Sequence, residues 1–235
     1  MTLPPLHPRC RCAIAYREVG TVGNVGGNIR RLTPELMREI RESEEKAVNT
    51  KTDADFGFKK MRGSPDWAKE IRLTNPINKR YGHTPNCQRC VVAHEVRMRG
   101  YDVIARPSWG QNDTTRIEKK WINAFASPSD FVKCIGKTSK DVIKSAEELM
   151  RSFGEGSRAI IVFKWDKSLV KSDGGHVIVA QCKEKGIVVF GDPQSGKIAA
   201  ARELYLADFN EGILLIRVDN LSLTNEVKRC CMNKE

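Results

Sequence analysis

The sequence lacks any long hydrophobic run. No stretch approaches the roughly 18 apolar residues that a membrane-spanning helix needs, and the mean hydropathy is −0.44. The first residues, MTLPPLHPRCRC, contain no apolar segment of the kind found in a signal peptide. These absences exclude a membrane protein and predict a cytoplasmic chain without an export signal.

Histidine and cysteine are both sparse. Only four of the 235 residues are histidines, and eight cysteines are too few for a disulfide scaffold. Without an export signal, we expect reduced thiols that serve as nucleophiles, metal ligands or core residues. The cysteines occupy positions 10, 12, 87, 90, 134, 182, 230 and 231. Cys230 and Cys231 lie in a charged segment and are expected to be exposed.

Acidic residues are outnumbered by basic ones. Lys and Arg total 40 against 29 Asp and Glu, which gives a net charge of +11. Such an excess favours contact with polyanions. The basic residues are spread along the chain without interleaved aromatics, so we expect at most weak, non-specific binding of nucleic acid.

The chain changes character along its length. Residues 1–30 are expected to be irregular, 31–72 to form a helical connector, 73–220 the main domain, and 221–235 a charged tail. Helical periodicity precedes β-branched segments separated by glycine turns, which predicts an α+β fold with N-terminal helices packed on a C-terminal antiparallel sheet. The expected helices are 33–48, 64–71, 86–99, 115–126 and 141–153, and the expected strands 101–105, 159–165, 176–182, 187–191 and 212–218.

Cys87 lies at the predicted start of a helix. If Asn86 is the N-cap, the Cys87 thiol faces unpaired backbone N–H groups, and the helix dipole stabilises a thiolate there. Cys90 lies one turn further on, beside two valines, which is typical of a core position, so it is the alternative nucleophile. The competing interpretation is that both cysteines are small buried hydrophobic residues.

A predicted hairpin supplies a base for this cysteine. If Cys182 pairs with Gly186 across the turn, the same register places His176 directly opposite Asp192. Opposed residues share a face of the sheet, and an Asp beside a His fixes its tautomer and stabilises the imidazolium. The alternative is that His176 is an ordinary strand residue and Asp192 a turn residue. A slip of one residue in register would break the pair.

Two further motifs are weaker. Cys87, Cys90 and His94 have the i, i+3, i+7 spacing of one helix face and would need Cys134 or Cys182 to complete a zinc site, an unusual arrangement. The segment 191–197 has the spacing of a phosphate-binding loop but lacks the Ser or Thr that should follow it. It is therefore interpreted as a turn that holds Asp192.

Three blocks of sequence carry a family resemblance. NCQRCVVAHEVRMRGYDVIARP, GGHVIVA and VVFGDPQSG follow one another over roughly residues 70–218. In this order they resemble the papain-fold toxin domain, also called the toxin glutamine deamidase domain. The resemblance implies a papain-like cysteine fold with Cys87 as nucleophile, His176 as base and Asp192 as orienting acid. It also implies an orienting or oxyanion role for Gln194, and it implies no metal or other cofactor.

The resemblance predicts an enzyme that deamidates glutamine side chains of a protein substrate. Peptide-bond cleavage and transamidation use the same acyl-transfer chemistry and stay open. The segment LPPLHPRCRC is similar to the end of a phage head-morphogenesis, or minor capsid, domain. This similarity suggests capsid proteins as partners and a virion-associated location. The alternative function is therefore an inactive phage accessory protein that contacts DNA or other capsid proteins.

Overall fold

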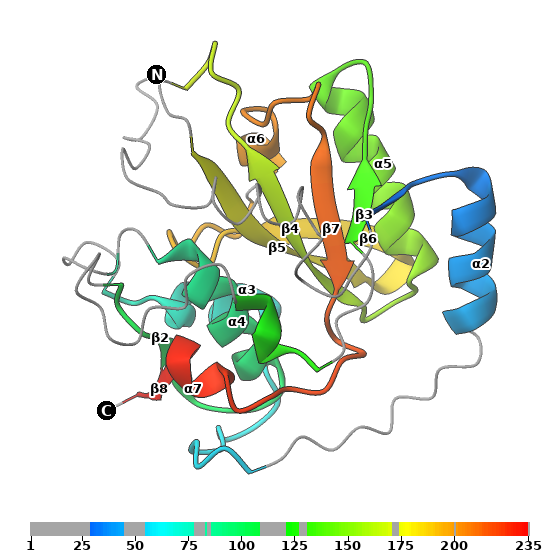
Figure 1. The fold of residues 1–235 in the computed structure, drawn as a ribbon. Coiled ribbons are helices and arrows are strands. Elements are labelled where there is room, and N and C mark those ends of the chain that lie inside the picture. The colour runs from blue at the N-terminus through cyan, green and yellow to red at the C-terminus, as the bar shows by residue number, and fades with distance from the viewer. Residues whose placement is uncertain are drawn as a thin grey trace.

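A computed structural model of the protein describes residues 29–44, 55–77, 83, 86–108, 121–126, 131–170, 174–199 and 201–234. Within these ranges, helices pack on a mixed sheet, as the α+β prediction requires (Figure 1). None of the described helices is long and apolar enough to span a membrane.

A six-stranded sheet forms the centre of the fold. Its spatial order is β1-β3-β7-β4-β5-β6, and neighbouring strands are antiparallel except for the parallel pair β1 and β3. The sheet is therefore mixed, where the sequence predicted a purely antiparallel one. The strands span Ile29–Arg31 (β1), Phe131–Cys134 (β3), Arg158–Lys164 (β4), Gly175–Lys183 (β5), Ile187–Gly191 (β6) and Ile213–Arg217 (β7).

Helices cover both faces of this sheet and divide the core in two. Alternate residues of β4, β5 and β7 face a first cluster built on α3, α4 and η2, and the remaining ones face a second cluster built on α5 with α2 and α6. In Figure 1, α3 and α4 lie together on one side of the sheet, whereas α5 lies on the other. The helices span Pro34–Glu44 (α2), Trp67–Thr74 (α3), Cys87–Met98 (α4), Trp121–Ala124 (η2), Ser139–Ser152 (α5), Glu184–Gly186 (η3), Ala201–Leu204 (α6) and Val227–Cys230 (α7).

Local signals in the sequence place several helix ends. Helix α4 begins at Cys87 after the N-cap Asn86, and Gly100 follows with a φ of 87°, which confirms the predicted helix. Helix α3 begins later than predicted, because the Asp66 side chain caps it by accepting from Lys69 N. Of the predicted helix 115–126, residues 115–120 lie outside the described ranges, and residues 121–124 form the 3₁₀ helix η2.

The C-terminal segment packs into the domain. After α7, strand β8 (Cys231–Asn233) pairs antiparallel with β2 (Val103–Ala105). Cys230 and Cys231 are 1% and 0% exposed, so the prediction that they are exposed is wrong. The physical reason is the pairing with β2, a contact between distant parts of the chain that the charged neighbours in the sequence conceal.

The hairpin of β5 and β6 has a different register from the predicted one. Cys182 pairs with Val188, not Gly186, so the register is shifted by two residues. The turn η3 contains Lys185 in the left-handed region, with a φ of 60°. Because side chains alternate with a period of two, a shift of two keeps every side chain on its predicted face.

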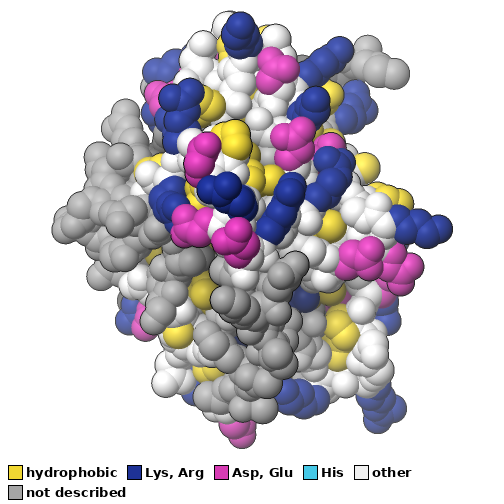
Figure 2. Space-filling view, turned by 90° about the vertical axis from the view of Figure 1, so that its right-hand side faces the viewer, with side chains coloured by type: hydrophobic (Ala, Val, Ile, Leu, Met, Phe, Trp, Pro, Cys, Tyr) yellow, Lys and Arg dark blue, Asp and Glu magenta, His cyan; other side chains and the backbone are white. Residues whose placement is uncertain are grey.

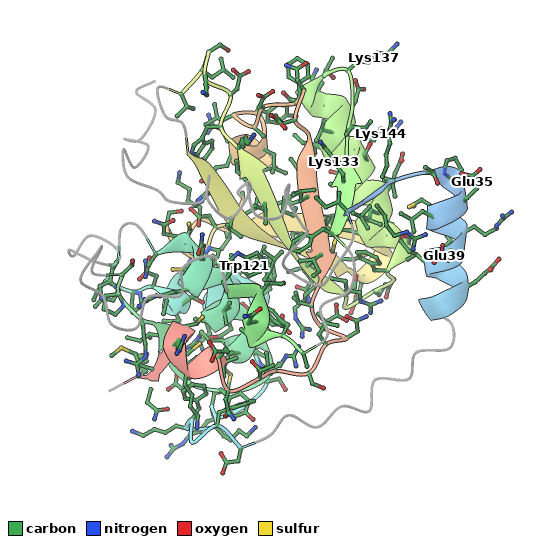
Figure 3. The ribbon with its side chains drawn as sticks, viewed as in Figure 1. Glu35, Glu39, Trp121, Lys133, Lys137 and Lys144 are labelled. Atoms are coloured by element: carbon green, nitrogen blue, oxygen red, sulfur yellow. The ribbon has the colours of Figure 1, made fainter. Side chains whose placement is uncertain are left out.

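Charges of both signs share the visible surface. On the face in Figure 2, Lys and Arg side chains are interspersed with Asp and Glu. Figure 3 places Lys133 and Lys144 on β3 and α5, and Glu35 and Glu39 on α2, which contacts α5. The described part of this face therefore presents no uninterrupted basic patch.

Candidate active site

The N-terminus of α4 positions the candidate nucleophile. The Asn86 side chain makes no capping hydrogen bond to the helix, and the first turn contains no acidic residue. The Asn86 side chain therefore does not satisfy the backbone N–H groups of the first turn, and no acidic residue in that turn offsets the positive end of the helix dipole. Both features favour negative charge at the start of α4.

The two cysteines of α4 are in different chemical states. Cys90 is a free thiol that is 0% exposed, and its Sγ donates to Asn86 Oδ1 at 3.2 Å. Burial, together with nearby Asp192, raises the pKa of the Cys90 thiol well above its ordinary value. Cys87 is disulfide-bonded, so the expectation of a reduced thiol is wrong at this position. The environment of Cys90 is that of a core residue.

His176 and Asp192 come together at the end of the β5–β6 hairpin. His176 Nε2 lies 3.4 Å from Asp192 Oδ2, and both side chains are 5% exposed. The indole of Trp165 stacks on the imidazole with ring centroids 5.5 Å apart, and Phe163 meets it edge-on. The predicted proximity of His176 and Asp192 thus exists, although Asp192 lies one residue beyond β6 instead of directly opposite His176.

A tight turn fixes the Asp192 carboxylate. Oδ1 accepts from Gln194 N at 2.9 Å and Oδ2 accepts from Ser195 Oγ at 2.5 Å, while Lys197 O accepts from Asp192 N. Burial opposes ionisation, but His176 and these hydrogen bonds outweigh it and lower the pKa of Asp192. The segment 191–197 is therefore the turn that the sequence predicted and not a phosphate-binding loop.

Close packing of α3 holds this turn in place. Gly191, the last residue of β6, lies so near α3 that a Cβ atom there would come within 2.7 Å of Ile71 Cδ1. A side chain at this position would have to displace Ile71 Cδ1 and would crowd Ile71 Cγ1 at 3.1 Å and Trp67 at 3.3 Å. Glycine thus allows the close approach of helix and strand.

A buried hydrogen-bond network joins the helix start to the turn. Asn75, which ends α3, donates to the backbone oxygens of His83 and Gln194, both at 2.9 Å. Its amide also contacts the Asn86 amide at 3.4 Å, and Asn86 donates to Arg106 O. Asn75 therefore links the residue before Cys87 to the turn that carries Asp192.

The Gln194 side chain is an unusual feature of this network. The residue is 1% exposed, yet neither its Nε2 nor its Oε1 has a hydrogen-bond partner among the described residues. An unsatisfied buried polar group costs about 1–3 kcal/mol. Such a group in a native fold calls for a functional explanation.

Glu203 is a member of the cluster that the sequence analysis missed. Its Oε2 lies 3.5 Å from His176 Nε2, and its Oε1 lies 3.4 Å from Lys197 Nζ. No local motif marks this residue, because α6 reaches His176 only through long-range contacts such as the bridge between Trp165 and Ala207.

Two sets of side chains in this region have the composition of a metal site. The ligand atoms of His176, Asp192 and Glu203 lie within 4.8 Å of one another, so these three side chains could hold a metal ion. The zinc site suggested by helix spacing does not assemble: Cys87 and Cys90 belong to the first core cluster, whereas Cys134 and Cys182 belong to the second, across the sheet.

Comparison with known proteins identifies a matching family. Residues 85–197 match the sequence model of the family described as papain fold toxin 1, glutamine deamidase. No curated protein and no solved structure matches significantly. The matched segment contains Cys87, His176, Asp192 and Gln194, and it supports a deamidase-like, amide-acting enzyme. The capsid-like segment LPPLHPRCRC lies outside both the match and the described residues, so the phage association stays a prediction.

Proposed function

We propose that the protein is a cysteine-dependent glutamine deamidase in which Cys87 is the nucleophile, His176 the base and Asp192 the orienting acid. The observation that carries this proposal is the buried contact between His176 Nε2 and Asp192 Oδ2, within the segment that matches the deamidase family. An imidazole held by a carboxylate is the arrangement that activates a nearby thiol.

The reaction is an acyl transfer. The Cys87 thiolate attacks the carbonyl carbon of a glutamine side chain, and the carbonyl oxygen becomes an oxyanion. Ammonia leaves with a proton from His176, which forms a thioester between Cys87 and the substrate. Water, deprotonated by His176, then hydrolyses the thioester to give glutamate and regenerate the thiol.

The first turn of α4 and Gln194 supply the donors for the oxyanion. The Cys87 backbone N–H belongs to a helix N-terminus that the Asn86 side chain does not cap. The second donor is Gln194 Nε2, which is buried without another partner within the described chain. These two donors would stabilise charge that develops only during the reaction, which is how an acyl-transfer enzyme lowers its barrier.

The disulfide at Cys87 adds a requirement for reduction. A sulfur in a disulfide is not a nucleophile, so a thiol reductant must first reduce the bond to two thiols. We expect ammonia release from a glutamine-rich protein probe such as casein only after this treatment. Activity of equal size before and after reduction would contradict the role of Cys87.

Variants of the two cysteines of α4 test the assignment. Cys87→Ala should abolish ammonia release and leave the fold intact, whereas Cys90→Ala should retain activity. Alkylation by iodoacetamide, read by peptide mass spectrometry, should modify reduced Cys87 well below the ordinary thiol pKa of about 8.5. His176→Asn should remove this low-pH reactivity. Labelling of Cys87 only near pH 8.5 would overturn the proposal without reference to any substrate.

The products distinguish the three acyl-transfer reactions. Deamidation releases ammonia and converts a glutamine to a glutamate in an intact chain. A peptidase would instead release fragments, and a transamidase would attach an added primary amine. Mass spectrometry of casein after incubation, with and without the amine, separates these outcomes.

A further inference from the structure

His176 faces two carboxylates, not one. Its Nε2 lies 3.4 Å from Asp192 Oδ2 and 3.5 Å from Glu203 Oε2. The two acids come from different places in the fold: Asp192 follows β6, and Glu203 lies on the short helix α6. A Cys-His-Asp arrangement requires only the first of them, so the second needs an explanation.

The surroundings of the two carboxylates are unequal. Asp192 is held by the backbone N–H of Gln194 and by the hydroxyl of Ser195. Glu203 Oε2 is buried and makes no hydrogen bond within the described chain, and the side chain as a whole is 12% exposed. Its other oxygen, Oε1, accepts from Lys197 Nζ at 3.4 Å, so Oε2 depends on its electrostatic contact with His176 alone.

The charges around Glu203 explain its behaviour. The titratable and charged groups that face it are Asp192, His176 and Lys197. Burial and the like charge of Asp192 raise the pKa of Glu203, while His176 and Lys197 oppose this rise. When Glu203 is ionised, a protonated His176 is the group that best compensates both acids.

We propose that Glu203 is a positioning residue that acts through His176: its carboxylate stabilises the imidazolium and holds Nε2 toward the acids. This inference rests on the proposed function, because it concerns the residue assigned as the base. The proposed mechanism then assigns the proton exchange with Cys87 to the other ring nitrogen, Nδ1.

The experiment is an NMR titration of the His176 imidazole. It is carried out in the Cys87→Ala background, so that neither the thiol nor the disulfide contributes and no substrate is needed. His176→Asn identifies the signal. We expect Glu203→Gln to lower the measured pKa of His176 by about one unit, as expected for the loss of one opposite charge at this distance.

Two matched variants serve as controls: one should shift the His176 pKa in the opposite direction, and the other should partly restore its wild-type value. Lys197→Met removes the cation beside Glu203 and should raise the measured pKa of His176, whereas Glu203→Asp keeps the charge and should restore part of the wild-type value. An unchanged His176 pKa in Glu203→Gln, with a native-like spectrum and melting temperature, would overturn the inference.

This result is independent of the test of the proposed function. If the His176 pKa shifts as expected but reduced Cys87 shows no low-pH alkylation, the electrostatic role of Glu203 holds and the deamidase mechanism fails. If Cys87 is reactive but the pKa of His176 does not respond to Glu203, the mechanism holds and Glu203 is only structural. In active enzyme, Glu203→Gln should shift the alkaline limb of the kcat profile to lower pH with little change in KM.

Discussion

Two groups of buried polar residues lie near opposite ends of helix α4, and they are satisfied to different degrees. At its C-terminal end is an ion cluster of Glu70, Glu95, Arg97, Arg99 and Arg158. Its carboxylates are all paired: Arg97 binds Glu70 at 2.6 Å, and Glu95 binds both Arg99 and Arg158 at 2.8 Å.

The candidate site near the N-terminal end is the opposite case. Gln194 has no partner for its amide among the described residues, Glu203 Oε2 makes no hydrogen bond there, and two acids share one imidazole. Buried charges in proteins are normally paired, and exceptions mark places where a ligand or a reaction completes the set. The ion cluster is thus satisfied internally, whereas the candidate site has buried groups that a substrate would have to complete under the proposed function.

The largest effect is expected from breaking the ion cluster. Glu95→Ala leaves Arg99 and Arg158 without their carboxylate, and removal of one partner from a buried pair costs about 3 kcal/mol or more. Urea denaturation should show this loss in the free energy of unfolding. The alkylation rate of reduced Cys87 should not change under conditions in which the variant is folded.

A surface pair supplies the control for this variant. Glu148 contacts Lys144 at 4.0 Å, with side chains 50% and 75% exposed, so Glu148→Ala should change the free energy of unfolding by less than about 0.5 kcal/mol. Equal effects of the two substitutions would remove the distinction between buried and exposed pairs.

Substitution of Gln194 should have the reverse effect of Glu95→Ala: it should reduce activity and not stability. Gln194→Met keeps the volume but removes the unsatisfied amide, so the free energy of unfolding should stay equal or rise. The rate of ammonia release should fall by roughly 10²-fold if the amide helps to hold the oxyanion. A loss of stability together with full activity would show that the Gln194 amide has a structural role instead.

Sequence reasoning reached the parts of the site that local patterns encode. The Asn86 N-cap placed Cys87 at the start of α4. The alternation of side chains along the β5–β6 hairpin placed His176 near Asp192. The predicted register was wrong by two residues, which left each side chain on its predicted face of the sheet. Both inferences depended on neighbours within a helix turn or a hairpin.

The parts that sequence reasoning missed depend on long-range contacts. Glu203 reaches His176 because α6 folds back beside the end of β4, and no pattern in the neighbouring sequence predicts this contact. Strand β1 is only three residues long and pairs in parallel with a strand distant in the sequence. Asn75 follows the predicted helix 64–71, and its role as the hydrogen-bond link between Asn86 and Gln194 appears only in three dimensions.

His94 tests whether an unsatisfied buried group always indicates function. It lies on α4 between the two regions, 1% exposed, with neither ring nitrogen hydrogen-bonded in the described structure, and it meets Trp67 edge-on at 4.7 Å. Burial keeps it neutral and lowers its pKa from 6.5 to about 3. The folded state therefore binds fewer protons than the unfolded state between these values, and stability must fall as the pH drops below 6.5.

Removing this histidine is expected to change how stability depends on pH and not to change the reaction. From pH 7 to pH 5, His94 should account for a loss of about 2 kcal/mol, at up to about 1.4 kcal/mol per pH unit. Glu95, whose pKa is lowered from 4.5 to about 2, contributes only at more acidic pH. His94→Leu should therefore flatten the dependence of the unfolding free energy on pH in this window and leave ammonia release unchanged. Loss of activity in a folded His94→Leu protein would show that the functional region extends along α4, which would contradict the separation between the ion cluster and the candidate site.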